Sequence, residues 1–246
     1  MSRMNPRVSF ECGGDTIRGW LALPSSVPPY PAVVLVPDVR GIYEHFRDVA
    51  RRFAGEGFAT LVLDPYSREG APNLPDMDAV FRWLRALPDR RVLADMQAAV
   101  GYLASRDDVR AAAIGVAGFC MGGQYALMAA CSVDGIAACV SWYGMLRYAE
   151  TNEAKSESPL AMAPRLACPY LGFFGEQDGL IPSSDVEELR GILAEHRKSF
   201  TIVRYPNAGH AFFNDARPAT YHAEAAHDSC ARGIGFFRQH LRVGAK

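Results

Sequence analysis

Residues 113–123 read AIGVAGFCMGG, an apolar run that leads into a glycine-rich turn. Within it Gly118, Cys120 and Gly122 form the pattern Gly-x-Cys-x-Gly, and residues 124–130 after it are compact and favour a helix. A sharp strand-to-helix turn brings the positions two before and two after its tip against neighbouring chain, where side chains do not fit. The pattern therefore predicts a strand, a turn that presents Cys120 as a nucleophile, and a helix.

A free cysteine is also among the most commonly buried residue types, so Cys120 could be an inert packing residue. The strand before the turn and the helix after it favour the nucleophile. The packing interpretation suits the five other cysteines, which lie in segments that resemble core: Cys12, Cys131, Cys139, Cys168 and Cys230.

Two later turns supply a carboxylate and an imidazole in the chain order nucleophile, acid, base. Asp178 lies in a polar turn after the apolar run 169–174, and His210 lies in a loop after residues 200–205. Taken singly, Asp178 could be an ordinary turn former and His210 an exposed loop histidine. Each follows a strand-like run, however, at the edge where open α/β sheets bind ligands. Together with Cys120 they predict a Cys-His-Asp triad.

The chemistry of a triad also needs donors for a developing oxyanion. The backbone N–H of Met121, directly after the nucleophile, is one expected donor. The other is the N–H of Val39 or of a neighbouring residue, in the loop after the early strand 32–36. Asp38 precedes Val39 in that loop. Its carboxylate could either tune the thiol or cap its own loop.

The rest of the chain alternates strand-like and helix-like segments. An N-terminal β-hairpin is expected from residues 8–11 and 16–23, and alternation of this kind predicts a mostly parallel sheet with helices on both faces. Further strands are expected at residues 32–36, 58–63, 113–117, 136–142, 169–174 and 200–205, and helices at 43–55, 77–87, 91–105, 121–131, 184–197 and 220–241. Residues 147–164 have no clear period and are expected to form a surface connection or to border the pocket.

Composition excludes several classes of function. The 246 residues are 49% hydrophobic and 22% charged, which suits one domain over residues 1–246. A net charge of −1 provides no basic surface for nucleic acid or anionic lipid. We see no signal peptide, membrane span, metal-ligand motif or Walker A motif, and no Cys-x-x-Cys pair. These observations predict a cytoplasmic protein without a metal site.

The three turns together resemble the dienelactone hydrolase family. The resemblance rests on GFCMGG at residues 118–123, GEQD at 175–178 and GHAF at 209–212, and it extends over most of the chain. It implies a single-domain α/β hydrolase that uses a Cys-His-Asp triad on lactones and related esters without a metal or organic cofactor.

The sequence departs from the family pattern at two positions. Family enzymes specialised for dienelactone have a glutamate at the position of Asp38, which pairs with the resting thiol, and an arginine at the position of Asn214, which helps to hold the substrate carboxylate. The resemblance therefore implies a weakened preference for carboxylated lactones. Tyr143 matches a pocket tyrosine of the family or is a structural aromatic. Arg82 or Arg85 matches a second family arginine or belongs to a solvated helix face.

These observations predict a cysteine-dependent hydrolase of small esters or lactones that acts through a thioester acyl-enzyme. An acyltransferase or thioesterase would use the same triad, and a non-catalytic binding protein could retain the scaffold. The expected partner is a small-molecule ester or lactone, rather than nucleic acid or a membrane, and the expected assembly is a monomer or a homodimer.

Overall fold

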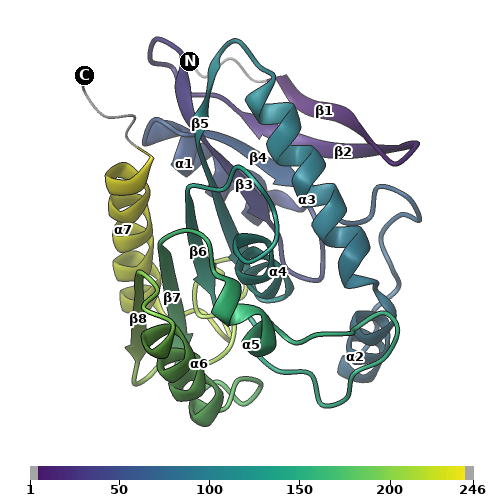
Figure 1. Cartoon of the computed structure of the whole chain (residues 1–246), viewed down its shortest axis with the longest axis vertical. Coiled ribbons are helices and arrows are strands. Elements are labelled where there is room, and N and C mark those ends of the chain that lie inside the picture. Colours follow the sequence, from purple (N-terminus) through teal and green to yellow (C-terminus); the bar gives the residue numbers. More distant parts are fainter. Residues whose placement is uncertain (1–4, 242–246) are drawn as a thin grey trace.

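A computed structural model describes residues 5–241, and all eight strands form one sheet (Figure 1). The strand order is β1-β2-β4-β3-β5-β6-β7-β8, in which β1 and β2 form an antiparallel hairpin, β2 pairs antiparallel with β4, and the remaining neighbours are parallel. The bounds are β1 Asn5–Cys12, β2 Asp15–Ala22, β3 Tyr30–Val36, β4 Ala59–Leu63, β5 Val109–Phe119, β6 Ala138–Trp142, β7 Tyr170–Gly175 and β8 Phe200–Tyr205. The expected α/β-hydrolase fold is confirmed.

Helices cover both faces of the sheet (Figure 1). On one face, α1 (Glu44–Gly55) and α7 (Ala223–His240) meet through the rings of Phe53 and Phe237, whose centroids are 6.2 Å apart. On the other face lie α3 (Asp89–Ala104), α4 (Met121–Ala130) and α6 (Ser183–Glu195). Burial of the apolar faces of these helices and of the sheet gives two layers of core, one on each side of the strands.

Two segments differ from the sequence-based expectation. Strand β5 begins four residues earlier than expected, because its pairing with β3 shifts register between Tyr30 and Ala32 and leaves residues 111–112 exposed. Such exposed residues carry no apolar signal for a strand. The segment 147–164 is also not wholly irregular: Ser158 caps a one-turn helix, α5 (Pro159–Met162), by accepting a hydrogen bond from the N–H of Ala161, and a short 3₁₀ helix follows at Ala163–Arg165.

The carboxyl ends of the central parallel strands are level with one another. Gly118 of β5 lies opposite Val36 of β3, and Trp142 of β6 lies between Phe119 and Phe173 of the neighbouring strands. The loops after β3, β5, β7 and β8 therefore emerge along a single edge, where parallel sheets bind their ligands.

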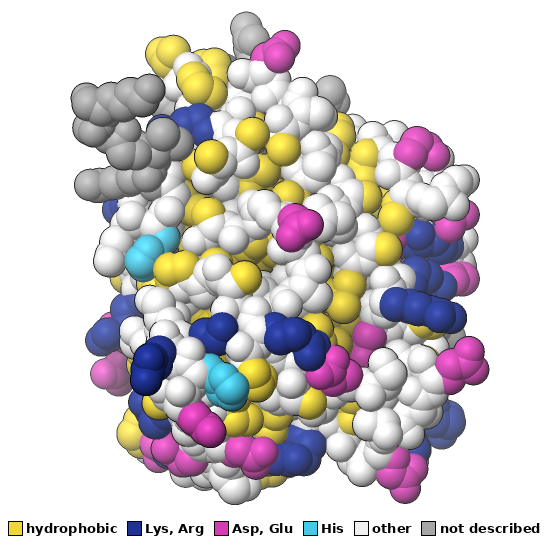
Figure 2. Space-filling model, viewed as in Figure 1, with side chains coloured by type: hydrophobic (Ala, Val, Ile, Leu, Met, Phe, Trp, Pro, Cys, Tyr) yellow, Lys and Arg dark blue, Asp and Glu magenta, His cyan; other side chains and the backbone are white. Residues whose placement is uncertain are grey.

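Helix α2 (Met77–Ala86) is attached more loosely than the others. None of its residues is fully buried. Its first turn is capped by Asp76, which accepts a hydrogen bond of 2.7 Å from the N–H of Ala79. On the face of the molecule seen in Figure 2, basic and acidic side chains are interspersed with scattered hydrophobic side chains. Within residues 5–241, no helix is both long and apolar enough to cross a lipid bilayer.

Candidate active site

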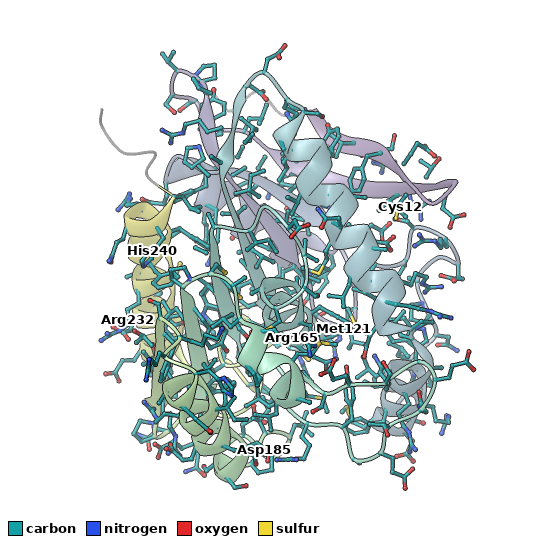
Figure 3. All side chains as sticks on the ribbon, in the orientation of Figure 1. Cys12, Met121, Arg165, Asp185, Arg232 and His240 are labelled. Atoms are coloured by element: carbon teal, nitrogen blue, oxygen red, sulfur yellow. The ribbon has the colours of Figure 1, made fainter. Side chains whose placement is uncertain are left out.

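The turn between β5 and α4 holds Cys120 in a strained backbone conformation. Its φ and ψ are 56° and −117°, and a positive φ is uncommon for a residue with a side chain. The N–H of Cys120 donates to the carbonyl of Trp142 (3.0 Å), and its carbonyl accepts from the N–H of Gln124 (3.1 Å). The turn thus presents Cys120 at the N-terminal end of α4, whose first residue, Met121, is labelled in Figure 3.

The glycines on either side of Cys120 are required by close contacts with backbone. A Cβ atom on Gly118 would lie 1.9 Å from the carbonyl oxygen of Gly122, and one on Gly122 would lie 2.0 Å from that of Val36. Neither position can accept a side chain without movement of the main chain. The same contacts place the first turn of α4 against the end of β3, so this glycine pattern also brings the nucleophile beside the loop after β3.

The structure brings the three predicted triad side chains together from three loops. Cys120 Sγ lies 3.1 Å from His210 Nε2, and His210 Nδ1 lies 2.8 Å from Asp178 Oδ2. The second carboxylate oxygen of Asp178 accepts a hydrogen bond of 2.8 Å from the N–H of Leu180, which fixes the orientation of the acid. The Asp178 side chain is 1% exposed and that of His210 is 17% exposed, so the acid is buried and the base faces the cleft.

The surroundings of His210 favour the imidazolium form. Burial by itself lowers the pKa of His210, but the negative charges of Cys120 and Asp178, with the hydrogen bonds that both make to the ring, raise that pKa to about 10. The imidazolium and the N-terminal end of α4 thus both place positive charge beside the sulfur.

Two backbone donors are available near the sulfur. Val39 lines the same cleft as Cys120, and its N–H makes no hydrogen bond within the described residues. The N–H of Met121 lies in the first turn of α4, where helix N–H groups have no intrahelical partner. These are the two groups that the sequence predicted as oxyanion donors.

Asp38 lines the cleft but makes its hydrogen bonds away from the sulfur. One carboxylate oxygen accepts from the N–H of Arg40 (2.9 Å) and the other from the hydroxyl of Tyr43 (3.1 Å). Asn214 in turn donates its side-chain N–H to the Tyr43 oxygen (2.6 Å). Of the two interpretations of Asp38, the geometry favours the cap of its own loop. Burial raises the pKa of the carboxyl above its usual range, although these hydrogen bonds oppose the shift.

Tyr143 and Asn214 are both buried, and neither lines the cleft. The Tyr143 ring packs edge-on against the His210 ring, with 5.2 Å between centroids, and so supports the base from behind. Asn214 holds Tyr43 in place instead of facing a ligand. The sequence left open whether Tyr143 is a pocket tyrosine or a structural aromatic. Its position behind the cleft lining favours the structural aromatic.

The cleft above the triad has a volume of about 430 Å³, a size typical of small-molecule sites. Two arginines, Arg40 and Arg217, line it, and neither has an ion-pair partner within 4.0 Å among residues 5–241. Neither arginine was predicted from the sequence as a cleft residue. Arg217 lies in the same loop as His210, seven residues later. A search for arginines over the whole of that loop, and not only at position 214, would have found it.

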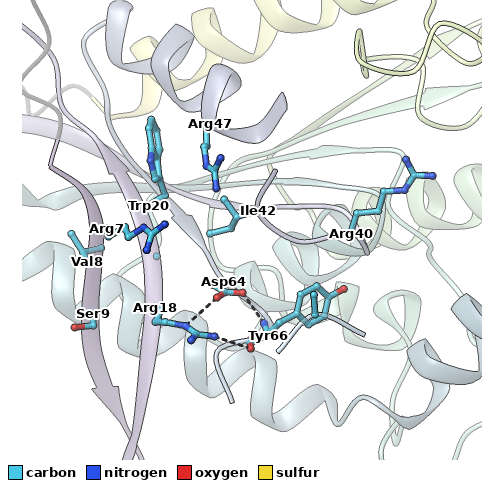
Figure 4. A pocket seen from close by; sticks show the side chains of 12 residues that line it. Arg7, Val8, Ser9, Arg18, Trp20, Arg40, Ile42, Arg47, Asp64 and Tyr66 are labelled. Carbon is cyan, nitrogen blue, oxygen red and sulfur yellow. Dashed lines mark hydrogen bonds and ion pairs between the residues drawn. The ribbon is translucent and has the colours of Figure 1, made fainter. Parts of the chain in front are cut away.

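The other candidate arginines lie outside this cleft. Arg82 is exposed on α2, and Arg85 pairs with Glu150 (3.0 Å). Both fit the solvated helix face better than a second substrate arginine. A neighbouring groove of about 520 Å³ beside β1 and β2 shares Arg40 with the cleft and contains Arg18, which pairs with Asp64 (Figure 4). Neither Cys120 nor His210 lines this groove.

Comparison with known proteins identifies the family of this chain. The profile of the dienelactone hydrolase family matches residues 17–241. The chain belongs to the dienelactone hydrolase family. A relative from Escherichia coli K12 named "Putative carboxymethylenebutenolidase" is 36% identical over 235 residues, which cover 94% of this chain and 86% of the relative. A Bradyrhizobium protein named "Probable 2-oxo-3-(5-oxofuran-2-ylidene)propanoate lactonase" is 35% identical over 95% of this chain and 94% of its own length.

A solved structure from Klebsiella pneumoniae, described as a "Putative Dienelactone Hydrolase", matches this member of the dienelactone hydrolase family with a TM-score of 0.89. It is 34% identical and covers 95% of this chain and 97% of its own. The protein is thus a hydrolase of the dienelactone hydrolase type, acting on carboxylic ester or lactone bonds. The interpretation as a non-catalytic binding protein is set aside.

Proposed function

We propose that the protein hydrolyses small esters or lactones by covalent catalysis, with Cys120 as nucleophile, His210 as the proton carrier and Asp178 as the group that orients His210. The observation that carries the proposal is the unbroken hydrogen-bonded series from sulfur to imidazole to carboxylate, with separations of 3.1 and 2.8 Å. A nucleophile, a base and an orienting acid within hydrogen-bond reach are the parts that acyl transfer needs.

In the acylation step the Cys120 thiolate attacks the carbonyl carbon, and the carbonyl electron pair moves to oxygen. The N–H groups of Met121 and Val39 would stabilise that oxyanion. When the intermediate collapses, the bond from carbon to the leaving oxygen breaks, and His210 Nε2 gives its proton to that oxygen. The products of this step are an alcohol, or the freed hydroxyl or enol of an opened lactone, and a thioester on Cys120.

In the deacylation step the role of His210 reverses. An acylated sulfur carries no charge, so the largest influence that raises the pKa of His210 disappears, while burial continues to lower it. The ring can then be neutral, accept a proton from water and direct the hydroxide to the thioester carbon. The carbon–sulfur bond breaks, the acid leaves, and the thiolate–imidazolium pair forms again.

The proposed substrate is a small molecule that fits the cleft of about 430 Å³. Asn214, in place of an arginine, predicts a weakened preference for carboxylated lactones, and this stays a prediction. Arg40 and Arg217 line the cleft from other positions and could hold a carboxylate. We also propose a cytoplasmic location, since a thiolate nucleophile is maintained best in a reducing compartment and all six cysteines are free.

The decisive experiment replaces the proposed nucleophile and base. We expect Cys120→Ala and His210→Ala each to lower kcat/KM for a small aryl ester by about 10³-fold or more. The matched control is Cys131→Ala, which removes a buried cysteine away from the cleft and should leave kcat/KM unchanged. The proposal is wrong if Cys120→Ala retains the turnover of the control. An acyltransferase or thioesterase with the same triad would be detected in the wild type by transfer to added alcohols or thiols in preference to water.

A further inference from the structure

A second cavity lies next to the catalytic cleft, under helix α2. This cavity, which we call the α2 chamber, has a volume of about 240 Å³ and shares Phe81, Leu84 and Met145 with the cleft as lining residues. Phe81 and Leu84 are three residues apart and lie on one face of α2. The same apolar helix face therefore borders both spaces, and the chamber adjoins the cleft at Met145.

The polar side chains at the inner end of the α2 chamber are paired with one another. Gln124 donates to the hydroxyl of Tyr148 (2.7 Å), and that hydroxyl donates to one oxygen of Asp89 (2.8 Å). The ammonium of Lys155 donates to the other oxygen of Asp89 (2.5 Å) and to Tyr125 (2.8 Å). None of the buried polar side-chain atoms that lack a partner within the described residues belongs to the lining of the chamber.

The charged side chains at the outer rim of the α2 chamber are also paired. Arg85 makes an ion pair with Glu150, and Arg147 makes ion pairs with Asp185 and Glu188. A charged ligand group would compete with these pairs for their partners, whereas a hydrocarbon group leaves them intact. In the catalytic cleft the opposite holds, because Arg40 and Arg217 have no ion-pair partner within the described chain.

We propose that the α2 chamber binds a neutral hydrocarbon group of the substrate, supplied by either its acyl half or its alcohol half. This inference rests on the proposed function, since it places the reacting carbonyl at Cys120 and the hydrocarbon beyond Met145. Helix α2 has no fully buried residue of its own, so its apolar face gains burial when such a group is bound.

Two series of esters test the inference and distinguish the two halves of the substrate. The first varies the acyl chain of p-nitrophenyl esters from acetate to hexanoate. The second varies the alcohol of alkyl acetates from methyl to hexyl, and their hydrolysis is measured by the release of acid. A buried methylene group contributes about fourfold, so we expect kcat/KM to rise by about tenfold or more along one of the series, mainly through KM.

The variant Ala149→Trp fills the chamber without altering the cleft, because Ala149 is exposed and lines only the chamber. We expect it to abolish the chain-length preference and to leave the turnover of the shortest ester within about twofold of wild type. The matched control is Ala86→Trp on the exposed surface of α2, which should retain the preference. Thermal melting of both variants checks that they fold.

The inference is overturned if neither series shows a chain-length preference, or if Ala149→Trp retains one. Calorimetric binding of hexan-1-ol to the Cys120→Ala variant separates this inference from the proposed chemistry. If hexan-1-ol binds and Ala149→Trp removes the binding, the chamber is supported. Normal ester turnover by Cys120→Ala would contradict the proposed chemistry but not the chamber. Absence of binding in a protein whose wild type hydrolyses acetate esters through Cys120 contradicts only the chamber.

Discussion

At the scale of single residues, the site depends on side chains that hold one another. Asp178 orients His210, and Tyr143 packs against the same ring from behind. Asn214 and Tyr43 hold Asp38, which shapes the loop of Val39. Side chains outside the triad thus determine where the reacting groups lie.

The ionisation of His210 predicts how Cys120 reacts. The raised pKa of His210, about 10, means that the ring is protonated from low pH up to that value and loses its proton only above it. A positive ring beside the sulfur favours its reactive form, so at pH 6 iodoacetamide should alkylate Cys120 faster in the wild type than in His210→Ala. In His210→Ala the positive charge is absent, so the alkylation rate should be lower at pH 6 and should depend more steeply on pH. Mass spectrometry of the Cys120 peptide across pH measures both, and the same profile in the two proteins would contradict the ion pair.

Arg217 is predicted to select substrates by charge. Arg217→Gln should raise KM about tenfold for a lactone or ester with a free carboxylate, because it removes a charged hydrogen bond. It should leave KM for the matching neutral ester unchanged. Arg82→Gln, outside the cleft, is the control for loss of one positive charge. Equal losses on both substrates would mean that Arg217 supports the loop instead of the ligand.

At the scale of elements, the decisive unit is the turn from β5 into α4. Its glycines let α4 begin directly against the carbonyl of Val36 at the end of β3, which a side chain at either position would prevent. This contact holds the strand, the turn and the helix together. The conformational strain of the positive φ at Cys120 is offset by the packing of α4, whose residues are all buried.

Gly118→Ala tests that account. The added methyl group would lie 1.9 Å from the carbonyl oxygen of Gly122, so we expect a loss of about 3 kcal/mol or more in the free energy of unfolding, or no soluble protein. Gly101→Ala is the control within α3, where the new methyl group meets no atom within 4 Å. It should stabilise by about 0.5–1 kcal/mol, since alanine favours helices. Urea unfolding compares them, and equal midpoints would refute the steric argument.

At the scale of the whole molecule, a buried ion pair joins segments far apart in the chain. Lys155, in the connection after β6, is 3% exposed and contacts Asp89 at the start of α3 and Tyr125 of α4. Burial lowers the pKa of Lys155 although Asp89 opposes the shift. The pair therefore fixes the path of the connection that forms one wall of the α2 chamber.

Removal of one partner should be costly. Lys155→Met leaves the Asp89 carboxylate buried without its cation, and we expect a loss of about 3–5 kcal/mol in the free energy of unfolding. Arg165→Met breaks an exposed pair with Glu157 in the same region and should cost about 1 kcal/mol or less. Denaturant midpoints for the two variants provide the comparison. If Lys155→Met unfolds at the midpoint of Arg165→Met, the pair does not hold the connection.

Much of the site was determined locally and was therefore visible in the sequence. The glycines around Cys120 are required by contacts within one turn and its immediate neighbours, and the alternation of apolar runs gave seven of the eight strands to within a few residues of their bounds. Chain order placed Asp178 and His210 after their strands, because parallel strands present all their carboxyl ends at one edge.

Other features depended on the tertiary structure. Whether Asp38 faces the sulfur or Tyr43, whether Tyr143 lines the cleft, and which arginines do so are set by side chains that meet from loops far apart in the sequence. The α2 chamber likewise arises only where α2, α4 and the connection after β6 come together. Backbone geometry follows local sequence because sterics act over a few residues, whereas a cavity is defined by the space that distant segments leave between them.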